Sequence, residues 1–227
     1  PRYCLWLGEC SPAELRKMPL CMDRINKVRE YRLASPSAGT IKLAERPMRF
    51  HVENMPKGNY IVVPEVSSQR RRYIPIGFFT PEIFCSNLVK IIPDATLYHF
   101  GILTSNVHMA WMRVVCGRLK SDYRYSKDIV YNNFPWPLPT EQQKQKIEQT
   151  AQAILDARAI YPDSSLADLY DELTMPSELR KAHQQNDKAV MQDYGFDIRT
   201  TTESSCVAEL MKMYQELTEK ENARGRK

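Results

Sequence analysis

The chain lacks the short motifs on which most catalytic and metal sites are built. It has 8 glycines in 227 residues, and none of them forms a glycine-rich loop after a strand or a P-loop. There is no H-E-x-x-H sequence, and the six cysteines include no C-x-x-C pair and no nearby histidine pair at zinc spacing. We therefore expect no catalytic residues, no cofactor site and no metal site within these residues.

Long apolar runs are also missing. The most apolar stretch, residues 95–115, is interrupted by two histidines, Ser105, Asn106 and Arg113, which favours a buried helix over a membrane span. No signal peptide is recognisable at the start. We expect scattered reduced thiols, a cytoplasmic location and no membrane partner. The opening "PRYCLWLGEC" resembles the interior of a domain, so we expect an excised fragment.

The two parts of the chain carry opposite charge. Residues 1–139 hold 20 Lys and Arg against 11 Asp and Glu, whereas residues 140–227 hold 12 against 16. A polyanionic partner would therefore meet the front part. The Pro-rich segment "NNFPWPLP" separates the two and is the best candidate for a domain boundary.

The front part combines helical and strand signals. Ser11 and Glu14 form a capping box with proline at the first helical position, which predicts a helix towards Leu33 with a break at Pro19. From Asn59, the runs "NYIVVPEV", "RRYIPIGFF" and "SNLVKIIP" are typical of strands, and the prolines inside two of them favour sheet edges.

A core helix is predicted after these strands. Asp94 is its candidate N-cap, residues 95–115 form it, and Gly117 ends it. The next two segments, "GRLKSDYRYS" and "SKDIVYNNFPWPLP", are predicted as strands, the second one buried and leading to the exit. We expect His99 and His108 to be core histidines, because both lie in the apolar helix.

The rear part is helical throughout. Thr140 and Gln143 form a second capping box, followed by an apolar face that includes Ile147 and Ile154. Further helices are predicted at residues 165–171, 176–194 and 202–222. The predicted fold class is therefore α+β: a mixed-sheet domain with a long buried helix over residues 1–139, followed by an all-α domain over residues 140–227.

The segment "GRLKSDYRYS" is the most informative candidate for binding. In a single strand, Lys120, Asp122 and Arg124 would share one face, with Tyr123 and Tyr125 directed into the core. Lysine can donate to guanine O6 and N7 in the major groove, and aspartate can accept from cytosine N4. By spacing alone, an exposed strand with a lateral Lys-Asp pair remains the better explanation, and it stabilises by only a few tenths of a kcal/mol.

The run "SSQRRRY", residues 67–73, is the strongest basic signal. Arginine and serine side chains both suit phosphate oxygens, and a turn between two strands would present them together. A solvated hairpin turn explains the run equally well.

Seven segments together resemble the C-terminal third of the MmeI-like proteins: "RYCLWL", "VSSQRRRYIPIGF", "LYHFGILTSNVHMAW", "GRLKSDYRYS", "VYNNFPWP", "LADLYD" and "MPSELRKAH". This family consists of large bacterial DNA adenine methyltransferases, many fused to an endonuclease and classed as type IIG or IIL restriction-modification enzymes. The resemblance implies that the chain is a target recognition domain followed by a helical C-terminal region. Residues 1–8 would form the junction with a missing methyltransferase domain.

The resemblance also implies roles for single residues. The base-reading positions would be Lys120, Asp122 and Arg124, with Asn87 and Leu88 as weaker candidates. By the chemistry of arginine and serine, and not by the resemblance, the contacts to the DNA backbone would come from Ser67, Ser68, Arg70, Arg71, Arg72 and Arg118. One departure is Gln69, where the family's Ser-Ser-Glu-Arg run would have glutamate. S-adenosylmethionine would bind to the parent protein, outside this chain.

The sequence therefore predicts a module that binds double-stranded DNA and reads bases in the major groove, beside an upstream methyltransferase domain of the same protein. By itself the fragment would not methylate or cleave. A non-enzymatic scaffold for a protein partner is the alternative from another class. An RNA-binding domain is a third interpretation, although no RNP-type aromatic motif is present.

Overall fold

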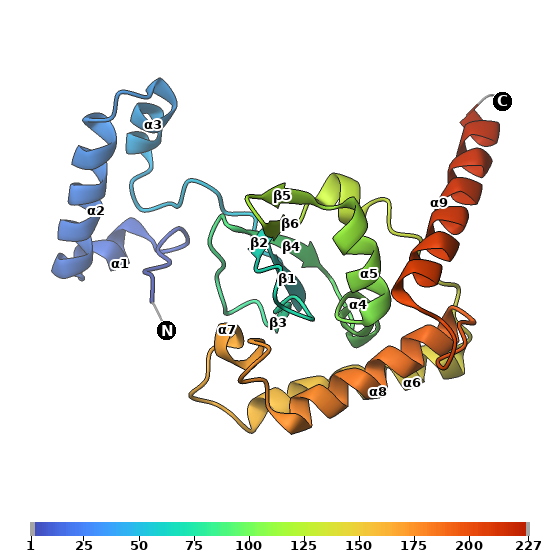
Figure 1. The fold of residues 1–227 in the computed structure, drawn as a ribbon. Helices are drawn as coiled ribbons and strands as arrows, with labels where there is room; N and C mark the ends of the chain where they lie inside the picture. Colours follow the sequence, from blue (N-terminus) through green and yellow to red (C-terminus); the bar gives the residue numbers. More distant parts are fainter. Residues whose placement is uncertain (1–2, 226–227) are drawn as a thin grey trace. The chain divides into compact units, whose positions relative to one another are not determined.

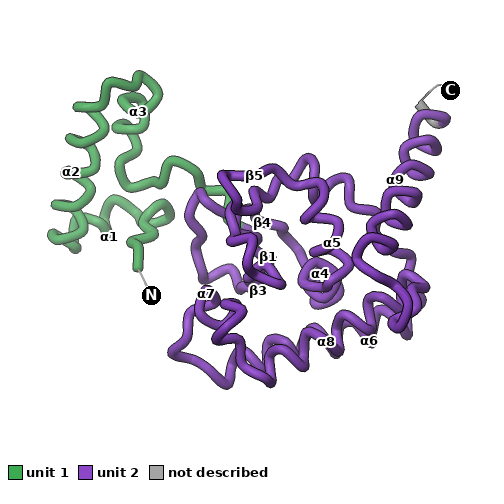
Figure 2. The backbone as a smooth tube through the Cα atoms, viewed as in Figure 1, with its two compact units in different colours: residues 1–55 green, residues 56–227 purple. Residues whose placement is uncertain are grey.

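The structure is a computed structural model that describes residues 3–225. It divides into two compact units, one ending at Met55 and one beginning at Pro56 (Figure 2). The expected junction, residues 1–8, falls partly on Pro1 and Arg2, which lie outside the described residues. Among the described residues, no helix combines the length and the apolar character needed to cross a membrane.

The first unit is helical and begins as the capping box predicts. Ser11 accepts a hydrogen bond from the backbone N–H of Glu14, whose carboxylate accepts one from Ser11 N–H in return. The predicted break at Pro19 is confirmed, because one helix ends at Arg16 and the next begins at Pro19. The elements of this unit are α1 (Pro12–Arg16), α2 (Pro19–Leu33), α3 (Ala38–Lys42) and a 3₁₀ turn, η1 (Leu43–Glu45).

Polar contacts hold much of the first unit together. The guanidinium of Arg32 in α2 donates to the carbonyl oxygens of Leu43, Arg46 and Arg49 at 2.8 to 3.0 Å. The buried apolar side chains in the described part of this unit are Leu15, Ile25 and Ala44. Because this apolar core is small, the hydrogen bonds from Arg32 are an important part of what holds the first unit together.

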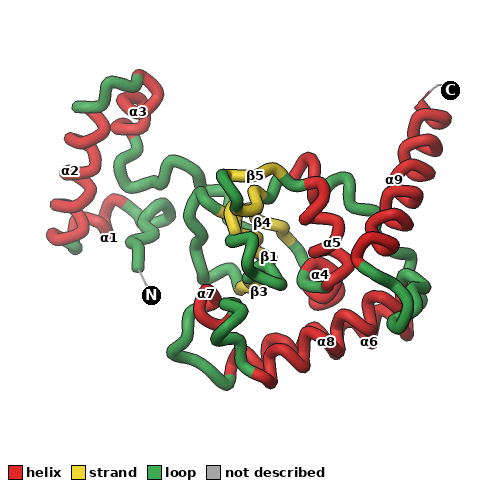
Figure 3. Tube along the Cα trace, viewed as in Figure 1, coloured by secondary structure: helices red, strands yellow, loops and turns green. Residues whose placement is uncertain are grey.

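The second unit is built around two small antiparallel sheets. The first has the strand order β3-β1-β4 and the second the order β2-β6-β5. The strands of this unit lie together, with helices to their right and below them in the view (Figure 3). The strands are β1 (Tyr60–Pro64), β2 (Val66–Ser67), β3 (Gly77–Phe79), β4 (Val89–Pro93), β5 (Gly117–Leu119) and β6 (Asp122–Arg124).

Two details of the expected sheets are corrected. Every strand pair described is antiparallel, so the sheets are not mixed, although the α+β class is confirmed. Prolines do not keep β1 at an edge, because it is the central strand of its sheet. Pro64 is tolerated since it is the last residue of β1, opposite Val89, where the ladder is ending.

The single core helix expected over residues 95–115 is two helices, α4 (Leu97–Leu103) and α5 (Asn106–Val115). Ser105 interrupts them, because its hydroxyl accepts a hydrogen bond from His108 N–H and so caps α5. Asp94 is not the N-cap. Thr96 occupies that place, and the ring of His99 accepts from its backbone N–H. The helical stretch ends at Val115, and Gly117 begins β5.

Two predicted strands have other structures. "GRLKSDYRYS" is a hairpin, formed by β5 and β6 around the two-residue turn at Lys120 and Ser121. Residues 127–131, expected in a buried strand, form a π-helical turn, η2 (Lys127–Tyr131), which begins because the Ser126 hydroxyl accepts from Ile129 N–H. Local serine caps outweigh the β-branched composition in this segment.

The rear helices follow the prediction. Thr140 and Gln143 form the expected box, and Gly195 ends α8 with a φ of 72°. α6 packs along α8, and α4 packs on α6 (Figure 1). The elements are α6 (Glu141–Ala159), α7 (Leu166–Leu169), α8 (Ser177–Asp193) and α9 (Glu203–Gly225).

One hydrophobic core runs through the whole second unit. Its buried members include Ile61 and Phe100 before the Pro-rich segment and Ile147 and Leu210 after it. The compact units of the structure therefore separate at Met55, and residues before and after Pro139 share one core. The division of the chain into two domains between Pro139 and Thr140 stays a prediction.

Candidate nucleic-acid interface

The β5–β6 hairpin carries three of the predicted base-reading residues. Leu119 pairs with Asp122 across the ladder, so the turn contains Lys120 and Ser121 alone. Asp122 and Arg124 lie two residues apart on one face of β6, as expected. Lys120 is not on that strand; it lies at the exposed tip of the hairpin. The single-strand arrangement of the three charges is therefore wrong, but the fold still brings them together.

Lys120 has a strained backbone. Its φ is 55°, in the left-handed region that glycine and asparagine adopt more readily. A left-handed conformation costs an ordinary residue about 1–2 kcal/mol. The ammonium makes no ion pair within the described part of the chain, so no internal contact offsets this cost. The tip therefore presents a free cation at a position where glycine would be more stable.

Asp122 has one oxygen engaged within the protein. Its Oδ1 lies 3.3 Å from the backbone nitrogen of Gln69, which donates to it. The carboxylate thus fixes the start of the arginine run against β6 and retains lone pairs for another donor. Asp122 is partly exposed, whereas Lys120 and Arg124 are exposed.

Glu65 links the hairpin to the first sheet. It lies between β1 and β2, and its carboxylate is 3.6 Å from Nη2 of Arg124 and 3.7 Å from Nζ of Lys90. Its backbone carbonyl accepts from Tyr125 N–H at 2.8 Å. A single residue therefore links the exposed face of β6 to β4.

The same residue brings in the second predicted segment. The backbone N–H of Glu65 donates to the carbonyl oxygen of Leu88 at 3.1 Å. Leu88 and its neighbour Asn87 are exposed, with 68% of the Leu88 surface accessible. Leu88, which follows Asn87, and Arg124 are far apart in sequence, and both contact Glu65. Sequence reasoning missed Glu65, although an acidic residue within the apolar run "YIVVPEV" was a usable signal.

The other face of β6 is part of the core, as predicted. Tyr123 and Tyr125 are 7% and 2% exposed. The hydroxyl of Tyr125 lies 3.0 Å from Nε2 of His108, which is fully buried. Burial lowers the pKa of His108 to about 3, so the ring is neutral near pH 7. His108 is a core histidine, as expected.

Arg118 covers the outer edge of this core face. Its guanidinium lies 4.3 Å from the centre of the Tyr123 ring and donates to the carbonyl of Ser121 at 3.2 Å. The residue remains exposed. Stacking on a buried tyrosine restricts the side chain while its charge stays available to solvent.

The arginine run divides between two directions. Ser67 is 3% exposed and pairs with Tyr123 in the ladder, so its expected contact with the DNA backbone is corrected. Ser68 is partly exposed, and Arg70 is exposed with no side-chain partner within the described residues. Arg71 reaches the other way and donates to the carbonyl of Ala167 at 3.4 Å.

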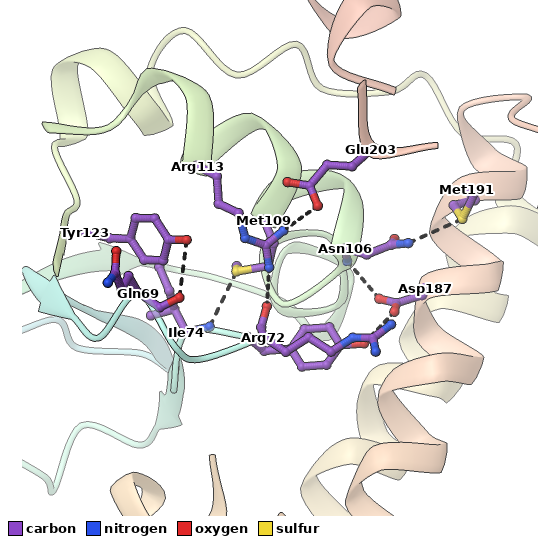
Figure 4. A network of polar contacts seen from close by, with 11 residues as sticks. Gln69, Arg72, Ile74, Asn106, Met109, Arg113, Tyr123, Asp187, Met191 and Glu203 are labelled. Carbon is purple, nitrogen blue, oxygen red and sulfur yellow. Dashed lines mark hydrogen bonds and ion pairs between the residues drawn. The ribbon is translucent and has the colours of Figure 1, made fainter. Parts of the chain in front are cut away.

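A buried carboxylate anchors the end of this run to the rear helices (Figure 4). Asp187 of α8 accepts from the hydroxyl of Tyr73 at 2.6 Å and from the backbone N–H of Asn106 at 2.8 Å. Burial raises the pKa of Asp187 to about 6, while these two hydrogen bonds act in the opposite direction. Nearby, Arg113 donates to the carbonyl of Arg72 at 2.6 Å and pairs with Glu203 at 3.1 Å.

Comparison with protein families gives two matches that together span almost the whole chain. Residues 1–138 match the family model described as "MmeI, target recognition domain". Residues 139–221 match the model described as "MmeI, C-terminal domain".

Single relatives agree with these matches. The chain is 41% identical over 219 residues to DNA methyltransferase A of Bacillus subtilis (strain 168), covering 96% of this chain and 25% of the relative. Among solved structures, it is similar to the type IIL restriction-modification enzyme MmeI in complex with DNA, with a TM-score of 0.85 and 49% identity. That match covers 95% of this chain and 29% of the enzyme, so the chain spans between a quarter and a third of either relative.

Proposed function

The chain belongs to the MmeI family, and from this membership we propose that it is the DNA-recognising part of a restriction-modification protein. Its front part would bind duplex DNA and read bases in the major groove. The solved relative was determined in complex with DNA, which supports this proposal. The division between recognition domain and helical domain would fall near Pro139, where the two family models meet.

The larger protein would methylate adenine in DNA. A methyltransferase domain of the same protein, upstream of this chain, would bind S-adenosylmethionine and take up the flipped base. The match to a quarter of a DNA methyltransferase supports this arrangement. An endonuclease fused to the same protein would add cleavage to methylation. Such a protein would act in the cytoplasm, where bacterial DNA lies.

The observation that carries the proposal is the meeting of the two predicted base-reading segments at Glu65. Lys120, Asp122 and Arg124 come from the hairpin, and Asn87 and Leu88 from the loop before β4. A lysine donates to guanine O6 or N7 and an aspartate accepts from cytosine N4. Lys120 and Asp122 would thus read the two halves of one G·C pair, with Lys120 reaching the groove from the tip.

Contacts to phosphate would position this reading edge. Ser68, Arg70 and Arg118 are accessible beside the hairpin and have the chemistry for phosphate oxygens. Arg71 and Arg72, also expected to contact phosphate, line a pocket on the side of α5. The helical part would brace the reading edge through the Tyr73–Asp187 contact and the shared core.

The test is an exchange of charges in the parent protein. Lys120→Glu with Asp122→Arg should change the base recognised at one position, with about 1–3 kcal/mol of discrimination at stake. The sequence of the methylated sites gives the readout. A matched control is Lys127→Glu with Asp128→Arg, because this exposed pair, 3.9 Å apart, lies just beyond the hairpin. An unchanged recognition site in the first variant would remove Lys120 and Asp122 from the readers.

A further inference from the structure

A polar pocket of about 460 Å³ lies in the second unit, and its wall begins at Gln69, next to the hairpin. We call it the arginine pocket. Its walls come from the arginine run, from α5 and from the segment that leads into α9, and the residues that bear on binding are Arg71, Arg72, Asn106, Val107, Ala110 and Met191. Pockets of this volume hold small molecules.

The arginine run gives the pocket an excess of positive charge. Arg70, Arg71, Arg72 and Arg113 all line it, against Glu172 and Glu203. Both carboxylates already have partners, since Glu203 pairs with Arg113 and Glu172 pairs with Arg180, each at 3.1 Å. Within the described residues, no carboxylate forms an ion pair with Arg71 or Arg72. Arg71 donates one hydrogen bond, to the carbonyl of Ala167 at 3.4 Å, and the Arg72 guanidinium lies 5.7 Å from the centre of the Tyr73 ring, where its charge acts on Asp187. Each guanidinium has five N–H donors, so both keep donors for an anion.

Two lining residues also have a buried polar atom without a hydrogen-bond partner. One is the donor Nε of Arg71, and the other is the acceptor Oδ1 of Asn106. A buried polar atom left unpaired destabilises the folded chain. The Asn106 amide nitrogen lies 3.4 Å from the sulfur of Met191, which holds the carboxamide in place (Figure 4). A ligand that both accepts and donates would satisfy both atoms.

The pocket also has an apolar surface. Val107 and Ala110 of α5 and Met191 of α8 line the pocket together with the arginines. The pocket therefore combines cations, one acceptor and an apolar wall. Phosphate esters of nucleosides combine the matching groups: phosphoryl oxygens, N–H donors and a flat ring.

We propose that the arginine pocket binds a nucleoside monophosphate, with phosphoryl oxygens on Arg71 and Arg72 and the base against the apolar wall. Asn106 Oδ1 accepts a hydrogen bond from an N–H group of the base. This site uses neither Lys120 nor the residues around Glu65. Its wall does include Arg70 and Gln69, whose backbone N–H donates to Asp122, so competition with duplex DNA tests whether the two sites are separate.

The direct test is calorimetric titration of the protein with AMP, with adenosine and with inorganic phosphate. AMP should bind saturably and more tightly than adenosine or phosphate, because it alone supplies both the phosphoryl group and the base. Arg71→Ala should weaken AMP binding at least tenfold. Arg29→Ala is the matched control, since Arg29 is an exposed arginine in the first unit, and it should bind AMP like the wild type.

A second variant keeps the test valid if Arg71→Ala fails to fold, which its melting curve would show. Asn106→Ala should lower the affinity for AMP severalfold and leave the affinity for inorganic phosphate unchanged. The ratio of AMP affinity to phosphate affinity should therefore fall. Absence of saturable AMP binding to the wild type overturns the proposal, as does equal binding by Arg71→Ala and Arg29→Ala.

Competition with DNA separates this proposal from the proposed function. The pocket is a separate site if AMP binding persists in the presence of saturating duplex DNA. Suppose instead that duplex DNA displaces AMP and that Arg71→Ala reduces the salt dependence of DNA binding as much as Arg70→Ala does. The pocket would then be part of the DNA-binding surface, and the nucleotide proposal would be overturned while the proposed function stood.

Discussion

The hydroxyl of Tyr73 donates to the carboxylate of Asp187 at 2.6 Å, across 114 residues of sequence. Tyr73 closes the arginine run, and Asp187 lies in the middle of α8. The contact fixes a loop of the front part to a helix of the rear part. Because both residues are buried, the hydrogen bond is made in a low-dielectric environment, where such contacts are strong when satisfied.

Replacing Asp187 by asparagine should change the pH dependence of stability. The folded-state pKa of Asp187 is about 6, above the ordinary value of 3.8. The Asp187 carboxyl group therefore makes its full contribution to the free energy of unfolding of the wild type below pH 4. This contribution is lost as the pH rises through 6. The asparagine side chain does not titrate, so the free energy of unfolding of the variant should rise relative to the wild type by roughly 2–2.5 kcal/mol between pH 4 and pH 7.

Urea unfolding at pH 4, 5, 6 and 7 measures this difference. Contributions from His108 and His183, whose pKa values are lowered by burial, are the same in both proteins and cancel. A difference that stays constant over the range would show that the carboxylate is not protonated in the folded state at pH 5.

Lys120→Gly should separate stability from recognition. Glycine adopts the φ of 55° without strain, so the free energy of unfolding should rise by up to about 1 kcal/mol. Discrimination at the base read by this position should be lost. The control is Lys127→Gly, which lies at the start of η2 and should lower stability by about 0.5–1 kcal/mol. If the variant is stable and its sequence specificity is unchanged, Lys120 does not read a base.

Arg70→Ala should weaken DNA binding equally for all sequences. Loss of one phosphate contact reduces the slope of log K against log salt concentration by about 0.9. Fluorescence anisotropy with a matched and a mismatched duplex at several salt concentrations provides the measurement, with Arg29→Ala as control. If the slopes are the same for both variants, Arg70 belongs to a solvated turn.

Gly101→Ala should destabilise the contact between α4 and α6. A Cβ atom at this position would lie 2.6 Å from Cγ2 of Ile147 and 3.2 Å from Cβ of Ala151. Overpacking of this kind costs about 1–3 kcal/mol. Gly39→Ala is the control, because its Cβ would lie no nearer than 3.8 Å to the neighbouring Ser37 hydroxyl. In thermal melts, the midpoint temperature should fall for Gly101→Ala and stay unchanged for Gly39→Ala.

Helix starts were predictable because their causes are local. The capping boxes at Ser11 and Thr140 involve residues three apart, so the sequence contains all the partners. Ser105 uses the same chemistry, but it is hidden within an apolar stretch whose length suggested one helix. The hairpin at Lys120 was missed for a different reason. Its turn has neither glycine nor asparagine, and the pairing of β6 with β2 maintains it.

The candidate site shows the same limit. The resemblance to a family supplied Lys120, Asp122 and Arg124, and spacing supplied the shared face of the last two. Neither could reveal that Glu65 holds Leu88 and Arg124 together, because that arrangement depends on contacts between segments distant in sequence. The pocket lined by Arg71 and Asn106 also arises only from tertiary packing.

The two faces of β6 have a consequence for how such a protein changes over time. Tyr123 and Tyr125 hold the strand in the core, while Asp122 and Arg124 project from the opposite face. Substitutions on the outer face leave the packing of the inner face intact. If Asp122 and Arg124 read bases as proposed, mutation on this face would sample new target sequences while the core side of the strand stays packed, which makes the strand a favourable region for randomised libraries.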